Sequence, residues 1–289
     1  MPSQVYDSVE SACPLCSSAS PLACACWNDS FRKRLLFADA ILRETFLLYR
    51  EVTFERNLAG TLWMREDARG KTFAISMLLA GYPTELGVDT YPLPKGFEEP
   101  DYVLERRAAL CAWQCDHAVA LLGPSVTSLL GDDLVDVKEV LVKGDEKWIP
   151  GDAWTYDDTT CDQESTFHKV LRVTDKNGEV YYLDYSCYQF GRSQTLMTKM
   201  FFERCGFDIL EVRDVGSTLK DDGHKWIHDV KDLFVGFIVD YFCEKPWDLL
   251  SLVDFEVNLE DVMYQFSVDV EKLLRQHKSA RESGRVLRR

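Results

Sequence analysis

The sequence predicts an α+β protein in which helices pack on a small antiparallel sheet. Residues 167–184 are rich in Val, Leu and Tyr on both sides of an Asp-Lys-Asn-Gly turn, the pattern of a β-hairpin. The chain before and after this hairpin carries apolar residues at helical spacing. With 46% hydrophobic residues in 289 positions, it can bury a substantial core. Helices, then a sheet, then helices are the order of an α+β fold.

Two helices are expected in the N-terminal part of the chain. From Trp27 to about Val52, apolar residues recur near helical spacing with Arg and Glu between them. A second helix is expected from Arg65 to Ala80. Gly and Pro residues at 81–83 and 91–96 follow it, and this loop is the clearest internal linker.

A longer helix is expected immediately before the sheet. It runs from Asp101 to Leu122, and the glycine and proline that follow at 123 and 124 are predicted to end it. A strand is expected from Leu134 to Val142. A polar loop from about Gly144 to Ser165 then leads to the hairpin.

The chain after the hairpin returns mainly to helix. We expect a helix from Gln194 to Cys205 and a short strand from Phe207 to Val212. Further helices are expected from Lys225 to Cys243 and from Leu259 to His277.

The turn of the hairpin determines which side chains share a face. Gly178 can adopt the positive φ of a three-residue loop closed by a glycine bulge, and Asp175 then lies opposite Glu179. In this register His168 and Asp184 project from one face as diagonal neighbours, roughly 5–8 Å apart. A two-residue loop would instead turn Asp184 to the opposite face.

His168 and Asp184 are therefore candidate catalytic residues. A carboxylate that orients an imidazole and favours its protonated form is what a general base needs to activate a thiol or hydroxyl. The alternative interpretation is that both are ordinary, partly exposed sheet residues.

Cys115 is the candidate nucleophile. It precedes a small apolar run, Ala118–Leu122, that would pack a helix against a sheet, and Cys111 is the alternate one helical turn earlier. A thiol next to an imidazolium ionises readily, and the thiolate is the attacking species. Both thiols lie within the helix expected for residues 101–122, and buried core thiols are the alternative interpretation.

Three stretches follow one another in the order cysteine helix, histidine strand, aspartate strand: Cys115–Leu122, Phe167–Val170 and Tyr181–Ser186. This order, over about residues 111–191, resembles the papain-like and transglutaminase-like cysteine enzyme superfamily. The resemblance implies a papain-like/transglutaminase-like core with helical N- and C-terminal extensions. It also implies a triad in which Cys115 is the nucleophile, His168 the base and Asp184 the orienting acid.

The expected function is that of a cysteine-dependent hydrolase or acyltransferase. The thiolate would attack an amide or thioester carbonyl, and water or an amine would resolve the acyl-enzyme, as in a peptidase, a deamidase or a transglutaminase-like enzyme. Gln114, or a backbone N–H near Cys115, would donate to the oxyanion. The competing hypothesis is a non-catalytic acidic α+β interaction protein that binds a basic partner.

The charge balance limits the partners. With 48 acidic and 33 basic residues, the formal net charge of −15 repels nucleic acid and anionic membrane surfaces. We expect a protein, peptide or small acyl substrate, and nothing in the sequence predicts an oligomeric state.

Fingerprints of nucleotide binding are absent from the sequence, and no cofactor is expected. No signal-peptide pattern opens the chain, so a cytoplasmic location is expected.

A zinc site near the N-terminus is a weaker hypothesis, under which the chain would be a zinc-stabilised adaptor. Two close cysteine pairs could supply four thiolates, but the second pair has one intervening residue where zinc motifs usually have two or more. His224 and His228 are four apart, but the glutamate of hydrolytic zinc motifs does not follow the first. The cysteines of the two pairs are Cys13, Cys16, Cys24 and Cys26.

We expect four regions along the chain. They are an irregular cysteine-containing arm at 1–30, a helical N-terminal region at 31–96, an α+β core with C-terminal helices at 97–275, and a basic tail at 276–289.

Overall fold

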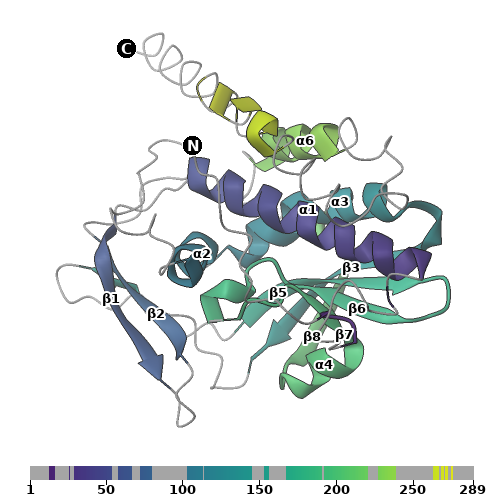
Figure 1. Cartoon of the computed structure of the whole chain (residues 1–289), viewed down its shortest axis with the longest axis horizontal. Coiled ribbons are helices and arrows are strands. Elements are labelled where there is room, and N and C mark those ends of the chain that lie inside the picture. The colour runs from purple at the N-terminus through teal and green to yellow at the C-terminus, as the bar shows by residue number, and fades with distance from the viewer. Residues whose placement is uncertain are drawn as a thin grey trace.

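Helices lie on both faces of a five-stranded sheet, and a three-stranded sheet lies to one side, in the computed structural model of the chain (Figure 1). Mixed helices and largely antiparallel strands confirm the predicted α+β class. The structure describes residues 13–16, 26, 29–53, 58–66, 72–79, 103–112, 114–144, 153–155, 167–190, 192–220, 227–238, 263–266, 268, 269, 271, 272 and 275.

Every neighbouring pair of strands in the five-stranded sheet is antiparallel. The strand order is β7-β6-β5-β3-β8. The strands are β3 (Leu134–Lys143), β5 (Phe167–Asp175), β6 (Val180–Leu183), β7 (Leu196–Thr198) and β8 (Asp208–Asp214). β3 and β8 agree, within one or two residues, with the strands predicted for 134–142 and 207–212.

Two helices cover one face of this sheet. α1 (Ser30–Val52) and α3 (Cys115–Leu130) pack with apolar side chains of β5 and β6. α4 (Lys199–Arg204) covers the other face, where Phe202 stacks on Tyr182 with ring centroids 3.7 Å apart (Figure 1). The candidate catalytic strand, β5, therefore lies between two apolar layers, and its side chains are buried on both faces.

A further helical layer lies over α3, on the side away from the sheet. α6 (Ile227–Ile238) contacts α3 directly. Phe266, in the C-terminal helical part of the chain, packs edge-on against Phe234 of α6 with ring centroids 5.0 Å apart. The described residues within 225–243 and 259–277 are therefore helical, as the sequence predicts.

The register of the β5–β6 hairpin is the one that the sequence predicts. Leu171 pairs with Leu183, and the Asp175 N–H donates to the Glu179 carbonyl at 3.0 Å. Gly178 has a φ of 81°. The three-residue loop with its glycine bulge is therefore confirmed.

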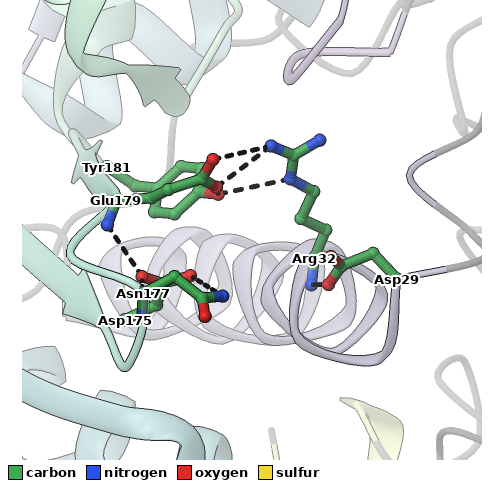
Figure 2. Close-up of polar contacts among 6 residues, drawn as sticks. All are labelled: Asp29, Arg32, Asp175, Asn177, Glu179 and Tyr181. Carbon is green, nitrogen blue, oxygen red and sulfur yellow. Dashed lines mark hydrogen bonds and ion pairs between the residues drawn. The ribbon is translucent and has the colours of Figure 1, made fainter.

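Two sets of side-chain contacts stabilise this loop, one within the loop itself and one from α1, as Figure 2 shows. The Asp175 carboxylate accepts the backbone N–H groups of Asn177 at 2.9 Å and Glu179 at 2.8 Å. Arg32 of α1 donates to both Glu179 carboxylate oxygens, at 3.0 and 3.1 Å, and to the Tyr181 hydroxyl at 3.4 Å. Because Arg32 lies in the first turn of α1, the start of that helix is fixed to the tip of the hairpin.

The helix predicted for Arg65 to Ala80 is wrong. The chain instead forms β1 (Leu58–Glu66) and β2 (Thr72–Leu79), which pair antiparallel, and β4 (Ala153–Thr155) pairs parallel to β2. Residues 73–79 are apolar at nearly every position, and such a run fits a strand as well as a buried helix. Pairing with other strands decides between the two structures, and a local pattern does not contain that information.

The single helix predicted for Asp101 to Leu122 is also wrong. Two helices occupy this stretch: α2 (Val103–Cys111) and α3, which begins at Cys115. α3 does not end at Gly123 but continues through Pro124 to Leu130. A Cβ on Gly123 would lie 3.0 Å from a Val215 methyl carbon, so this glycine permits close packing rather than ending the helix.

The helix predicted from Gln194 to Cys205 begins later than expected. The first part of that stretch forms β7, and α4 starts after Thr198, whose hydroxyl accepts the Phe201 N–H at 3.3 Å as an N-cap. Several predictions lie outside the described residues: the linker at 81–96, most of the polar loop at 144–165, Cys24, His224 and the basic tail at 276–289.

Replacing Gly178 with Ala is expected to destabilise the protein by about 1–2 kcal/mol, because an L-residue is strained at positive φ. Gly236 in α6 is the matched control. A Cβ has open space at both positions, so only the backbone conformation differs. Gly236→Ala is expected to raise the free energy of unfolding by up to about 1 kcal/mol. Urea denaturation measures both, and equal effects would contradict the assigned turn.

Candidate active site

Cys115 is the first residue of α3. The sequence places it inside a continuous helix, but residues 112–114 separate α2 from α3. The backbone N–H groups of the first turn of a helix have no partner within the helix, and the positive end of the helix dipole lies there. The thiol therefore lies where an α-helix best stabilises negative charge.

Contacts from other elements hold the end of α2 in place. The buried Arg50 of α1 donates from Nε to the Leu110 carbonyl at 3.1 Å. The Cys111 thiol donates to the Tyr185 carbonyl at 3.4 Å. The turn that follows then positions Cys115 at the start of a new helix, and the Gln114 carbonyl accepts the first hydrogen bond of that helix from Ala118 N–H at 2.9 Å.

His168 lies near the start of β5, where β6 no longer runs beside it. It pairs with Val142 of β3, whereas β6 ends at Leu183, opposite Leu171. After Leu183 the chain turns and forms a short 3₁₀ helix at Cys187–Phe190. This turn brings Asp184 and the residues after it to the histidine.

The imidazole and the carboxylate form a fully buried ion pair. His168 Nε2 lies 2.8 Å from Asp184 Oδ1, and the two side chains are 1% and 0% exposed. Ser186 donates to the same oxygen from its backbone N–H at 3.2 Å and from its hydroxyl at 3.4 Å. Phe190 packs edge-on against the imidazole, with ring centroids 4.8 Å apart.

The environment of His168 favours its protonated form. Burial lowers the pKa of the imidazole, but the charge and close contact of Asp184, together with the nearby Cys115 thiol, raise the pKa to about 10. An imidazolium at neutral pH is a counter-ion for both a carboxylate and a thiolate. The structure thus brings together all three residues of the predicted triad.

The alternate nucleophile, Cys111, lies in a different environment. Its side chain is completely buried, and burial raises the pKa of the thiol well above its ordinary range. Cys115 is partly exposed, so a reagent or substrate can reach it. Of the two thiols that the sequence offers, Cys115 is the better placed to react.

Two glutamine side chains lie close to the triad. Gln114, the predicted oxyanion donor, is buried and directly precedes Cys115. Gln189 was missed by sequence analysis: its side chain is buried, and its Nε2 lies 3.4 Å from His168 Nδ1. An amide can offer N–H to a neutral imidazole or its oxygen to an imidazolium. No sequence motif marks Gln189, because only the turn after β6 brings it to the ring.

No family model matches the chain, and neither a curated protein nor a solved structure does. The chemistry of the site is therefore argued from its geometry.

A partly exposed ion pair links the two elements that carry Cys115 and His168. Asp116, next to Cys115, contacts Lys169, next to His168, at 3.0 Å between Oδ1 and Nζ. Lys169 also donates to the Thr218 hydroxyl at 3.4 Å. This pair holds the first turn of α3 against the start of β5.

Asp184 is held by its backbone as well as by its side chain. Its N–H donates to the Thr195 carbonyl at 2.8 Å. The Thr195 hydroxyl lies 2.8 Å from both carboxylate oxygens of the buried Asp39, on α1. The acid of the site is therefore fixed through Thr195 to the same helix that positions the end of α2.

Two further expectations from the sequence concern the N-terminal cysteines and membrane-spanning helices. The sulfurs of Cys13, Cys16 and Cys26 lie within 4.8 Å of one another, whereas Cys24 lies outside the described residues. Within the part of the chain that the structure describes, none of the helices combines the length and apolar character needed to cross a membrane.

Replacing Asp184 with Asn should lower the pKa of His168 from about 10 to below its ordinary value of 6.5. Burial is the largest influence on this pKa and lowers it, and the substitution removes the main opposing charge. NMR titration of the imidazole measures the change, with His168→Gln identifying the resonance.

Ser186→Ala is the control, because it removes a hydroxyl from the same carboxylate oxygen and keeps the charge. It should leave the titration nearly unchanged. The raised pKa also means that the ion pair contributes fully to stability below about pH 6.5 and that this contribution is lost as the pH rises through about 10. A titration that Asp184→Asn does not alter would contradict the assigned pair.

Proposed function

We propose that this protein is a cysteine-dependent hydrolase or acyltransferase that acts on an amide or thioester. One arrangement carries the proposal: the partly exposed Cys115 begins α3 close enough to His168 to raise the pKa of the imidazole, and His168 Nε2 contacts Asp184 at 2.8 Å. A nucleophile, a base and a group that orients the base are thus contiguous.

We also propose that residues 111–191 form a papain-like/transglutaminase-like core. Support comes from the arrangement of the three residues on their elements. The nucleophile begins a helix that packs on an antiparallel sheet, the histidine lies on a strand, and the aspartate follows the neighbouring strand. Cys115, His168 and Asp184 thus come, in chain order, from a helix, a strand and the end of the next strand, which is the order that the sequence resemblance implies.

The first half of the reaction forms an acyl-enzyme. The Cys115 thiolate attacks the carbonyl carbon, a C–S bond forms, and the electron pair of the C=O bond moves to the oxygen. Backbone N–H groups of the first turn of α3, with Gln114 or Gln189, are the donors available to this oxyanion. His168 then gives its proton to the leaving amine or thiol as the C–N or C–S bond of the substrate breaks.

The second half releases the acyl group. Neutral His168 takes a proton from water or from an acceptor amine, which attacks the thioester carbonyl. The C–S bond to Cys115 breaks, and the thiolate and imidazolium are restored. Water gives hydrolysis, and an amine gives transfer. Throughout, Asp184 keeps the imidazole oriented and neutralises the imidazolium.

A specific observation favours a second candidate function, that of an interaction protein. β8 is an edge strand of the five-stranded sheet and carries three exposed apolar side chains, Ile209, Leu210 and Val212. Apolar residues on an exposed strand edge are typical of a surface that pairs with another chain. Under this hypothesis the buried triad residues would be structural, and Cys115 would not be unusually reactive.

At neutral pH a thiol-directed alkylating agent should modify Cys115 at least about tenfold faster in the native chain than in the His168→Gln variant, because the adjacent imidazolium favours the attacking thiolate. Cys115→Ala should abolish the fast phase and leave the circular dichroism spectrum unchanged. Peptide mass spectrometry assigns the modified residues.

The buried Cys111 provides an internal control, and it should stay unmodified until the protein is unfolded. Fast modification of another cysteine, with Cys115 inert, would overturn the proposed nucleophile and favour the interaction protein.

A further inference from the structure

Three cysteine sulfurs gather beside the start of α1. The sulfurs of Cys13, Cys16 and Cys26 all lie within 4.8 Å of one another. Two thiolates on one tetrahedral zinc ion lie about 3.8 Å apart, since each Zn–S bond is about 2.3 Å long. The three sulfurs are thus close to the separation that a shared metal requires. We propose that these three cysteines bind a structural zinc ion.

The local chain geometry suits this role. Cys13 and Cys16 flank a tight turn, and a Cys-x-x-Cys turn directs two sulfurs toward one point, as zinc motifs require. Cys26 lies just before α1, and its carbonyl accepts the N–H of the N-cap residue Asp29 at 3.2 Å. The third sulfur is therefore fixed by the beginning of a long, buried helix.

Burial of the cluster also favours a metal. Cys13 and Cys26 are 3% and 1% exposed, and they pack with Leu15 and with Leu36 of α1. Cys16 is exposed, so an ion can enter from solvent. Thiols that bind zinc lose their protons, and neighbouring buried thiolates need a cation to balance their charge. Three soft sulfur ligands prefer zinc over magnesium or calcium.

The described residues supply three of the four ligands that structural zinc usually takes. A water molecule can take the fourth position, because Cys16 is exposed to solvent. A disulfide is the competing chemistry, but it joins two sulfurs and would leave the third cysteine without a role.

The zinc ion would connect the N-terminal arm to the segment that holds Asp184. The Gln194 side-chain amide donates to the Pro14 carbonyl, inside the cysteine turn, at 3.2 Å and to the Leu196 carbonyl at 3.0 Å. Thr195, between them, accepts the Asp184 N–H. The metal would therefore stabilise the position of the chain segment around Thr195, and it would take no part in the chemistry of Cys115.

Elemental analysis of the purified full-length chain, kept reduced and without added metal, tests the proposal. We expect about one zinc ion per chain. Cys16→Ser should reduce the zinc content at least about tenfold, and because Cys16 is exposed this variant should still fold. Cys115→Ser is the matched control. It removes a thiol outside the cluster and should retain the metal, which separates this site from the proposed active site.

Cobalt substitution provides a second measurement that does not depend on how the variants fold. The zinc-free chain titrated with Co²⁺ should develop the thiolate-to-cobalt charge-transfer band and the intense visible bands of a tetrahedral sulfur site, and Zn²⁺ should abolish both. Absence of zinc and of these bands would overturn the proposal. A disulfide between two of the three cysteines, detected by mass spectrometry in a chain that binds no metal after purification under reducing conditions, would also overturn it.

Discussion

The buried ion pair between His168 and Asp184 is the interaction on which the rest of the structure depends. Both side chains are almost completely inaccessible to solvent, and their charged groups lie 2.8 Å apart. Two charges in an apolar layer are tolerated only when they are paired and hydrogen-bonded, since removing either leaves an uncompensated buried charge. The surroundings supply the additional hydrogen bonds through Ser186 and Gln189. Such an arrangement is costly to build, and buried titratable groups with specific charge partners cluster at functional sites.

One helix, α1, contacts three segments that lead to this site. Near its start, Arg32 binds the tip of the hairpin whose second strand leads to Asp184. In its middle, Asp39 holds Thr195, which accepts the Asp184 N–H. Near its end, Arg50 holds the last turn of α2, just before Cys115. Polar residues in a buried helix are expected to have such specific partners, because each would otherwise lose hydrogen bonds to water. The proposed zinc ion would fix the residues that precede the same helix.

The sequence predicts correctly those parts of the fold that are determined by interactions between residues close together in the chain. The register of the hairpin followed from Gly178 and Asp175, since a turn determines the pairing of the strands it joins. The break before Cys115 could not be predicted, because it depends on Arg50 reaching the Leu110 carbonyl from a distant helix. The sequence wrongly predicts a helix end at Gly123, because the packing of this glycine against Val215 is a tertiary contact. Gln189 carried no signal for the same reason, and the strands at 58–66 and 72–79 needed partners that no local pattern specifies.

If the His168–Asp184 pair activates Cys115 as a nucleophile, brief exposure of the protein to an activated acetyl ester should acetylate Cys115, and mass spectrometry detects the product. We expect a single acetyl group on Cys115, formed at least about a hundredfold faster in the native chain than in the His168→Gln variant. Ser186→Ala, which keeps the ion pair, should acetylate at nearly the native rate. Acetyl groups distributed over exposed residues, at rates that His168→Gln does not alter, would contradict this role of the pair.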